Sequence, residues 1–209
     1  YGLWVITIFL FPHPRMALSK SFTLPYVTVS VMPSSKKNQN PQLLEGLSKE
    51  LSCSLLHDML RIRLIEEGIA SLYPEQEMRC PVHLCIGQEA IPVGVCSNLT
   101  GEDIVMGNHR SHGHYLAKGG DLNAMMAEIY GKSTGCSKGI GGSMHLIDLS
   151  VNFLGTTPIV ASIIPVAVGT AFASWLNNEN RVTVIFLGRG ATEEGVFTES
   201  LNFAALKKL

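Results

Sequence analysis

Apolar residues recur every three or four positions between Leu44 and Leu72, which is the spacing of one face of an amphipathic helix. These positions are Leu44, Leu47, Leu51, Leu55, Met59, Ile62, Ile65, Ile69 and Leu72. The charged residues Arg61, Arg63, Glu66 and Glu67 indicate the more solvent-exposed side of the same helix. Because proline cannot continue a helix, we expect this long helix to end at Pro74.

From Gly87 onward, glycines become frequent and short apolar runs alternate with helix-like stretches. The pattern predicts buried strands at 103–106 and 181–187, and a glycine loop at 188–195. It also predicts helices at 122–130, 159–176 and 196–209. Asp121 is the expected N-cap of the first of these helices. The segment 159–176 is apolar nearly all round, so we expect that helix to be buried. The order strand, glycine loop, helix is typical of an open α/β sheet that binds ligands at the carboxyl ends of its strands.

The first 41 residues have a different composition. Tyr1–Phe11 is apolar but too short to span a bilayer as a helix, which takes about 20 residues. Ser19–Pro41 is rich in Ser, Lys, Asn and Pro, and no acidic residue precedes Glu45. We therefore expect residues 1–41 to be an unstructured leader or extension outside a domain at 42–209. An acid-free, Ser-rich leader also resembles a transit peptide.

Composition narrows the class of protein. The chain has 209 residues, of which 46% are hydrophobic and 16% charged, enough to bury the core of one domain. A formal net charge of -1 gives no electrostatic case for binding nucleic acid or a membrane surface. Five cysteines without a Cys-x-x-Cys pair indicate free thiols in a reducing compartment, the cytoplasm or alternatively the mitochondrial matrix.

Two glycine segments are candidates for phosphate binding. Gly131-Lys-Ser133 lacks a preceding strand and has Met126 where a phosphate loop has its first glycine, so it is better interpreted as a helix end. Gly188-Arg-Gly190 lies between an apolar strand and a helix, where free backbone amides would face a diphosphate. The spacing to Gly195 does not fit the dinucleotide fingerprint.

His109, His112 and His114 are closely spaced around Arg110, and Cys80, His83 and Cys85 lie earlier in the chain. Such spacings are compatible with zinc ligation, but no second pair at zinc-site spacing accompanies them. A surface loop or a phosphate clamp fits the histidine cluster better, because the guanidinium of Arg110 binds phosphate oxygens bidentately. We assign no residue as a metal ligand.

Several motifs then occur in one order along the chain. They are His83-Leu-Cys-Ile-Gly-Gln-Glu-Ala90, Asn108-His-Arg-Ser-His-Gly113, Gly139-Ile-Gly-Gly-Ser-Met-His145, Ile159-Val160 with Pro165 and Gly169, and Gly188-Arg-Gly-Ala191 followed by Glu199-Ser-Leu-Asn-Phe-Ala-Ala205. Together they resemble the alpha subunit of the first, decarboxylating component of 2-oxo acid dehydrogenase complexes, a family that includes pyruvate, branched-chain 2-oxo acid and acetoin dehydrogenases. The resemblance extends from about Leu43 to Leu209.

This resemblance implies a thiamine-diphosphate-binding α/β fold, an open and mostly parallel sheet with helices on both faces, incomplete at the carboxyl end. It implies thiamine diphosphate and magnesium as cofactors. By position, His83 would lie near the thiazolium as the catalytic residue, and His109 and Arg110 would contact the diphosphate. Val160 would line the cofactor pocket. The backbone amides of Gly190 and Ala191 would face the diphosphate and magnesium, and Gly139–His145 would be a flexible loop beside the site.

The resemblance also implies partners and a reaction. Family enzymes are alpha-beta heterotetramers in which the beta subunit supplies the pyrimidine side of the cofactor site. The reaction is oxidative decarboxylation of a 2-oxo acid such as pyruvate, with transfer of the acyl group to a lipoyl disulfide on the acyltransferase component.

One departure from the family stands at position 189. The family has Gly-Asp-Gly at 188–190, and its aspartate binds the magnesium ion; this chain has Arg189. At ~4 Å and an effective dielectric of ~20, a unit charge and a divalent ion interact with an energy of roughly 8 kcal/mol. Replacing the aspartate by arginine therefore turns an attraction for magnesium into a repulsion. Ala161 and Ser162 also stand where relatives tend to have glycines. The alternative function is therefore a catalytically inactive paralogue or a degraded gene product.

Overall fold

The centre of the molecule is a mixed β-sheet. The computed structural model describes residues 5–10, 22–24, 27–32 and 47–209. Within them the strands are β1 (Val5–Leu10), β2 (Phe22–Leu24), β3 (Val27–Met32), β4 (Ile104–Gly107), β5 (Phe153–Thr156) and β6 (Thr183–Gly188), in the order β2-β3-β1-β6-β4-β5. Strands β6, β4 and β5 are parallel, whereas β2, β3 and β1 continue the sheet from β6 in antiparallel pairing.

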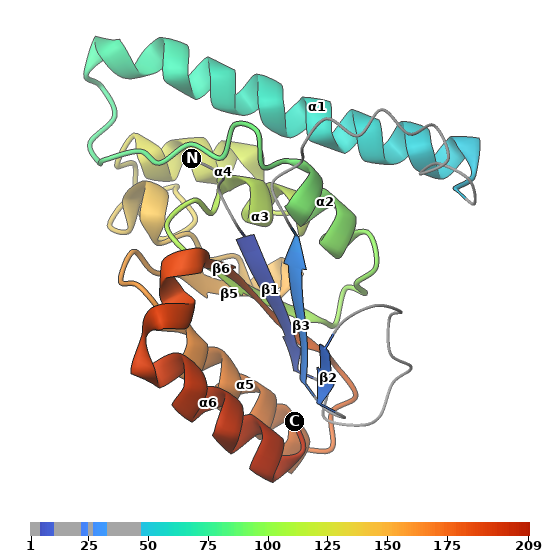
Figure 1. Ribbon diagram of the computed structural model, residues 1–209. Coiled ribbons are helices and arrows are strands. Elements are labelled where there is room, and N and C mark those ends of the chain that lie inside the picture. Colours follow the sequence, from blue (N-terminus) through green and yellow to red (C-terminus); the bar gives the residue numbers. More distant parts are fainter. Residues whose placement is uncertain (1–4, 11–21, 25–26, 33–46) are drawn as a thin grey trace.

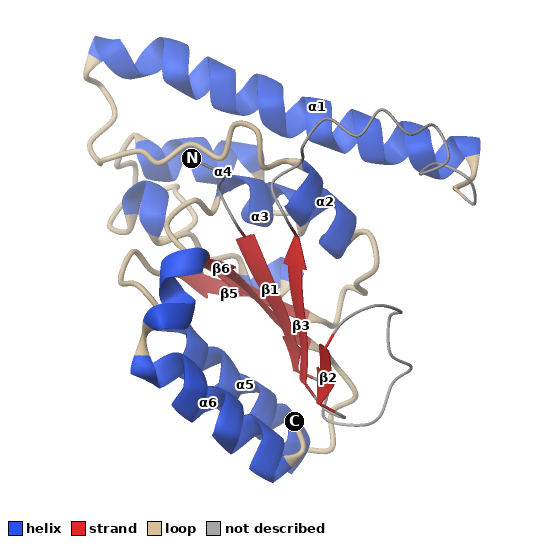
Figure 2. Ribbon diagram, viewed as in Figure 1, coloured by secondary structure: helices blue, strands red, loops and turns tan. Residues whose placement is uncertain are grey.

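Helices cover both faces of this sheet (Figures 1 and 2). One layer contains α1 (Lys49–Leu72), α2 (Ala90–Cys96), α3 (His112–Ala117) and α4 (Leu122–Ile129). The other contains α5 (Ile163–Leu176) and α6 (Gly195–Lys207). Short 3-10 helices are η2 (Tyr73–Glu75), η3 (Gly142–Met144), η4 (Leu149–Val151) and η5 (Arg189–Glu193). The expected α/β fold with an open sheet is confirmed, and the sheet is parallel in the part contributed by residues after α1.

Strand β6 joins two hydrophobic cores. Val184 and Phe186 pack into the core beneath α1–α4, and Ile185 and Leu187 pack into the core beneath α5 and α6. Successive side chains of a strand point to opposite faces, so a strand buried on both sides is apolar throughout. This explains why the continuous apolar run at 184–187 is part of a strand.

The helix predictions hold in part. The Ala124 amide donates to Asp121 Oδ1 at 2.9 Å, which confirms Asp121 as the N-cap of α4. The segment 159–176 differs from the expectation, because α5 begins only at Ile163 and buries one face. Val166 and Leu176 on its other face are 54% and 57% exposed. The prediction of a helix buried all round is therefore wrong for this chain.

Helix α1 begins after Ser48, whose Oγ accepts from the Leu51 amide at 3.1 Å. Ile62 and Ile69 on its predicted apolar face are buried, and η2, which contains Pro74, follows the helix. Glu66 was expected on the more solvent-exposed side but is fully buried. It lies between Ile62 and Ile69 at helical spacing, so the helix geometry carries it into the core.

The amino-terminal segment also differs from the expectation. Residues 1–41 were predicted to be unstructured and outside the domain, yet their described parts are strands β1, β2 and β3. Strand β1 pairs along the whole of β6, from Val5 opposite Gly188 to Leu10 opposite Thr183, and Ile8 and Leu10 are fully buried. Four of the six residues at 5–10 are β-branched, which suits a strand that pairs with the edge of β6 and satisfies its hydrogen-bonding groups. The other residues of 1–41 lie outside the described part.

Among the residues that the structure describes, no helix is both long enough and apolar enough to cross a bilayer.

The buried histidine His114 predicts a pH-dependent stability. Burial lowers the pKa of His114 from 6.5 to about 3, with the neighbouring His112 adding to the effect. Because the unfolded chain takes up this proton and the folded chain does not, the stabilisation is present above pH 6.5 and is lost as the pH falls below it. We expect the free energy of unfolding to fall by roughly 1.4 kcal/mol per pH unit from this group alone.

The measurement is denaturant unfolding of the parent and of His114→Leu at pH 6.5 and pH 5. The parent should lose about 1.6 kcal/mol more than the variant over that interval. His57→Leu, at a histidine whose side chain is 75% exposed, is the control and should keep the slope of the parent. Equal slopes for all three chains would contradict the buried neutral histidine.

Candidate functional site

A pocket of about 120 Å³ opens where the parallel strands end. Three separate segments line it, one after each of β4, β5 and β6. The lining residues are Asn108, His109, Thr157, Pro158, Ile159, Val160, Ala161, Ile163, Leu187, Gly188, Gly190 and Ala191. Carboxyl ends of neighbouring parallel strands meet at one edge of the sheet, which is why Asn108 and Ala191, 83 positions apart, converge here.

Most of the predicted site residues meet at this pocket. His109, Val160, Gly190 and Ala191 line it directly. His83 lies next to His109, with the ring centroids 5.0 Å apart in an edge-to-face arrangement. Arg110 is the exception, because its side chain is not among the lining residues, although its amide donates to Asn108 Oδ1 at 3.0 Å and so shapes the turn.

The two neighbouring histidines differ in their surroundings. His83 Nδ1 is buried without a hydrogen-bond partner. Burial lowers the pKa of His109, and the neighbouring Arg110 and His83 lower it further, so the His109 ring is neutral at neutral pH. A buried polar atom without a partner is uncommon in folded proteins, so His83 Nδ1 retains an unused hydrogen-bonding position next to the His109 ring.

The turn after β6 fits the diphosphate of a cofactor. A Cβ built on Gly190 would meet nothing within 4 Å, so the backbone is open to close approach by an anion. Gly190 belongs to η5, which runs into the 13-residue helix α6. Backbone amides at such a position favour negative charge. The glycine and the orphaned His83 nitrogen together suit a phosphate-bearing heterocycle.

A magnesium ion does not fit the same residues. Magnesium is held in proteins through carboxylates, and the lining residues contain none. Arg189 is exposed between two lining glycines, and Glu193 and Glu194 are exposed as well. Within the described ranges, no group of three His, Cys, Asp or Glu side chains could hold a metal ion.

The three closely spaced histidines do not act together. His109 lines the pocket, His112 bonds to Glu66 and Ser143, and His114 stacks on Phe186 with ring centroids 4.0 Å apart. His112 and His114 are buried in α3, so the expected surface loop is wrong beyond Arg110. The zinc alternative is contradicted because the side chains reach different partners.

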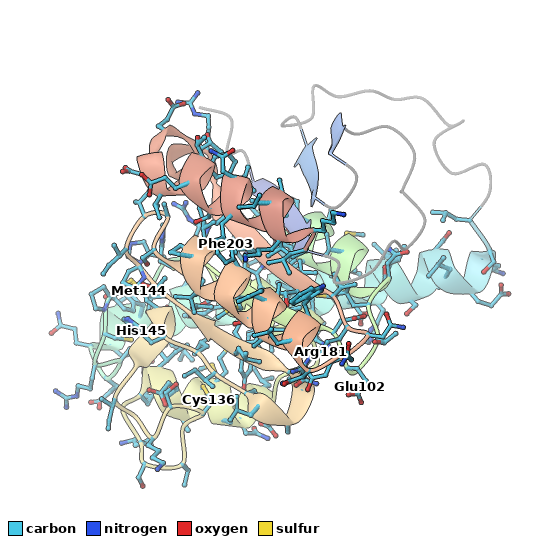
Figure 3. All side chains as sticks on the ribbon, turned by 90° about the horizontal axis from the view of Figure 1, so that it is seen from below. Glu102, Cys136, Met144, His145, Arg181 and Phe203 are labelled. Atoms are coloured by element: carbon cyan, nitrogen blue, oxygen red, sulfur yellow. The ribbon has the colours of Figure 1, made fainter. Side chains whose placement is uncertain are left out.

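The Gly139–His145 segment is held by a buried carboxylate that sequence reasoning missed. The Glu128 carboxylate accepts from the amides of Ser137, Gly139, Gly141 and Gly142 at 2.7–2.9 Å. Figure 3 labels Met144 and His145, which lie next to each other at the end of this segment. The expected flexible loop is therefore an anchored turn, and its residues do not line the pocket.

Comparison with known sequences defines the class of protein to which this fold and site belong. The sequence profile of the Dehydrogenase E1 component family matches residues 57–209, so the chain belongs to that family. Its relatives are alpha subunits. The chain is 43% identical to the alpha subunit of acetoin:2,6-dichlorophenolindophenol oxidoreductase from Bacillus subtilis (strain 168), over 79% of this chain and 50% of the relative.

Pyruvate dehydrogenase E1 component alpha subunits are similarly related. That of Porphyra purpurea is 44% identical over 78% of this chain and 50% of the relative. The chloroplastic alpha-3 subunit of Arabidopsis thaliana is 40% identical over 88% of this chain and 44% of the relative. The chain thus spans about half the length of the curated relatives that it matches.

Ala161, in the pocket wall, predicts a stabilising glycine substitution. Its φ is +64°, a left-handed conformation that costs an L-residue about 1 kcal/mol and glycine little. We expect Ala161→Gly to raise the free energy of unfolding by about 0.5–1 kcal/mol. The control, Ala173→Gly at an exposed position inside α5, should lower it by about 1 kcal/mol. Losses of equal size in denaturant unfolding would contradict the left-handed backbone at 161.

Proposed function

We propose that this chain is part of an alpha subunit that binds thiamine diphosphate and takes part in the oxidative decarboxylation of a 2-oxo acid such as pyruvate, with acyl transfer to a lipoyl disulfide. The observation that carries the proposal is the convergence of His109, Val160, Gly190 and Ala191 on one pocket, with His83 against His109. Family membership supports the same assignment.

Each side chain has a defined task in this proposal. Gly190 and Ala191 present backbone amides to the diphosphate, and Val160 gives an apolar wall to the ring system. His109, neutral at neutral pH, accepts or donates one hydrogen bond at the same wall. His83 holds or moves a proton at the substrate through its nitrogens, one of which has no protein partner. Thiamine diphosphate, when bound, supplies the carbanion chemistry of the decarboxylation.

A beta subunit is the proposed partner, and a lipoyl-bearing acyltransferase component the proposed acceptor. Exposed apolar side chains on the α5–α6 layer support a protein partner, because such surface is unusual on a monomer. Leu206 is 78% exposed and Phe203, labelled on α6 in Figure 3, is 40% exposed. The proposed family domain is 42–209, to whose strand β6 the strand β1 is added. The proposed compartment is the cytoplasm, with the mitochondrial matrix as the alternative.

The proposal is tested by titrating thiamine diphosphate into the full chain mixed with a beta subunit. Gly190→Val should weaken binding about tenfold or more, because its side chain fills the space left for the diphosphate. The matched control is Gly101→Val, at an exposed loop glycine that also has nothing within 4 Å of a Cβ. Equal affinity for both variants would argue against the pocket as the cofactor site.

Arg189 supports a second candidate function, a catalytically inactive subunit that docks to a beta subunit. A permanent cation stands beside the pocket and no carboxylate lines it. We expect thiamine diphosphate to bind weakly and independently of magnesium, and Arg189→Asp to make binding magnesium-dependent with at least tenfold higher affinity. Calorimetry with and without magnesium measures this. The matched control Arg181→Asp, remote from the pocket lining, should change neither quantity. Strong magnesium dependence in the parent would exclude the inactive alternative.

A further inference from the structure

Three fully buried side chains connect the elements that surround the candidate site. Glu66 belongs to α1, His112 begins α3 and Ser143 belongs to η3. Glu66 Oε1 lies 2.6 Å from His112 Nδ1, and His112 Nε2 lies 2.7 Å from Ser143 Oγ. All three residues are 0% exposed.

Hydrogen-bonding chemistry fixes one direction in this chain of contacts. A carboxylate oxygen accepts, so His112 donates from Nδ1–H to Glu66, and the Ser143 hydroxyl, which can donate or accept, completes the hydrogen bonding at Nε2. The same residue types form the nucleophilic triads of hydrolases. Here no atom of Ser143 reaches the surface, so no substrate can reach it, and the arrangement serves to position rather than to react.

The second oxygen of Glu66 extends the connection to His83. Glu66 Oε2 accepts from the Cys85 amide at 2.6 Å, two residues after His83. Through Oε1 the same carboxylate holds His112, three residues after His109. A single buried side chain therefore bonds to both of the segments whose rings meet edge to face at 5.0 Å.

The geometry points to Glu66 as a positioning residue that fixes His83 against His109, with Ser143 fixing the orientation of the His112 ring. The functional part of this inference rests on the proposed function, because it assumes that the two histidines face the cofactor. A carboxylate away from water is stabilised mainly by the hydrogen bonds that it accepts. Removing its charge weakens both bonds at once and releases the two segments from one another.

The experiment uses the full chain with isotope-labelled histidines, mixed with a beta subunit for the binding measurement. Nuclear magnetic resonance reports the protonated nitrogen of His112 and the through-space contact between the His83 and His109 rings. The variants are Glu66→Gln and Ser143→Ala. The matched control is Glu67→Gln, one position along α1 and exposed. In the parent and the control we expect the proton of His112 on Nδ1 and a strong contact between the two rings.

In Glu66→Gln the Gln amide can donate to His112, so we expect the proton to move to Nε2 and the contact between the rings to be lost. Ser143→Ala keeps the carboxylate bridge and should weaken the contact without moving the proton. Thiamine diphosphate affinity should fall about tenfold or more in Glu66→Gln and stay unchanged in Glu67→Gln.

Each outcome decides between the two claims. If the parent binds thiamine diphosphate and Glu66→Gln retains both the affinity and the contact between the rings, the positioning role is overturned and the proposed function stands. If no chain binds thiamine diphosphate, the proposed function fails, and the contact between the rings still decides the role of Glu66. If Glu66→Gln does not fold, an unchanged contact between the His83 and His109 rings in Ser143→Ala overturns the proposal. If neither variant folds, the proposal is overturned as well.

Discussion

The parallel pairing of β6, β4 and β5 is the constraint on which the site depends. In this register Val105 lies opposite Val184 and Met106 opposite Ile185, so the ends of β4 and β6 are brought level. The turns that follow each strand then face one another across a pocket. The apolar side chains that alternate across β6 fill a core on each face, so neither helix layer can shift without disturbing strand packing.

Two buried carboxylates accept hydrogen bonds from backbone amides that belong to no α-helix or β-strand. Glu128 satisfies four amides in a glycine-rich segment that has no ladder or long helix of its own. Glu66 does the same for the Cys85 amide while also bonding to His112. An ionised group is costly to bury, and several short hydrogen bonds to each oxygen pair offset that cost. The two carboxylates thereby hold the irregular segments near the site, although neither Glu66 nor Glu128 lines the pocket itself.

The pocket itself has a distinctive electrostatic character, which is set by the residues that line it. Its lining is apolar and amide-rich, and the charged group nearest its glycine turn along the chain is the Arg189 cation. Such a site attracts an anionic diphosphate and opposes a bound divalent cation. The left-handed Ala161 adds backbone strain to the same wall. At position 189 the chain carries a cation where the resemblance implies the aspartate of a Gly-Asp-Gly turn, and at position 161 it carries an alanine in a left-handed conformation.

The sequence by itself determined the α/β class and the family, because periodicity and ordered motifs are local properties of the chain. It also named four of the residues that line the pocket, His109, Val160, Gly190 and Ala191. It indicated β4 at 103–106, the Asp121 cap and the glycine turn after β6. Only the tertiary structure decided which polar residues are buried. Glu66 and His112 look like solvated or ligand-facing groups in the sequence, and their mutual hydrogen bond joins residues 46 positions apart. The pairing of β1 with β6 was likewise beyond the local pattern, because an edge selects its partner strand from the whole chain.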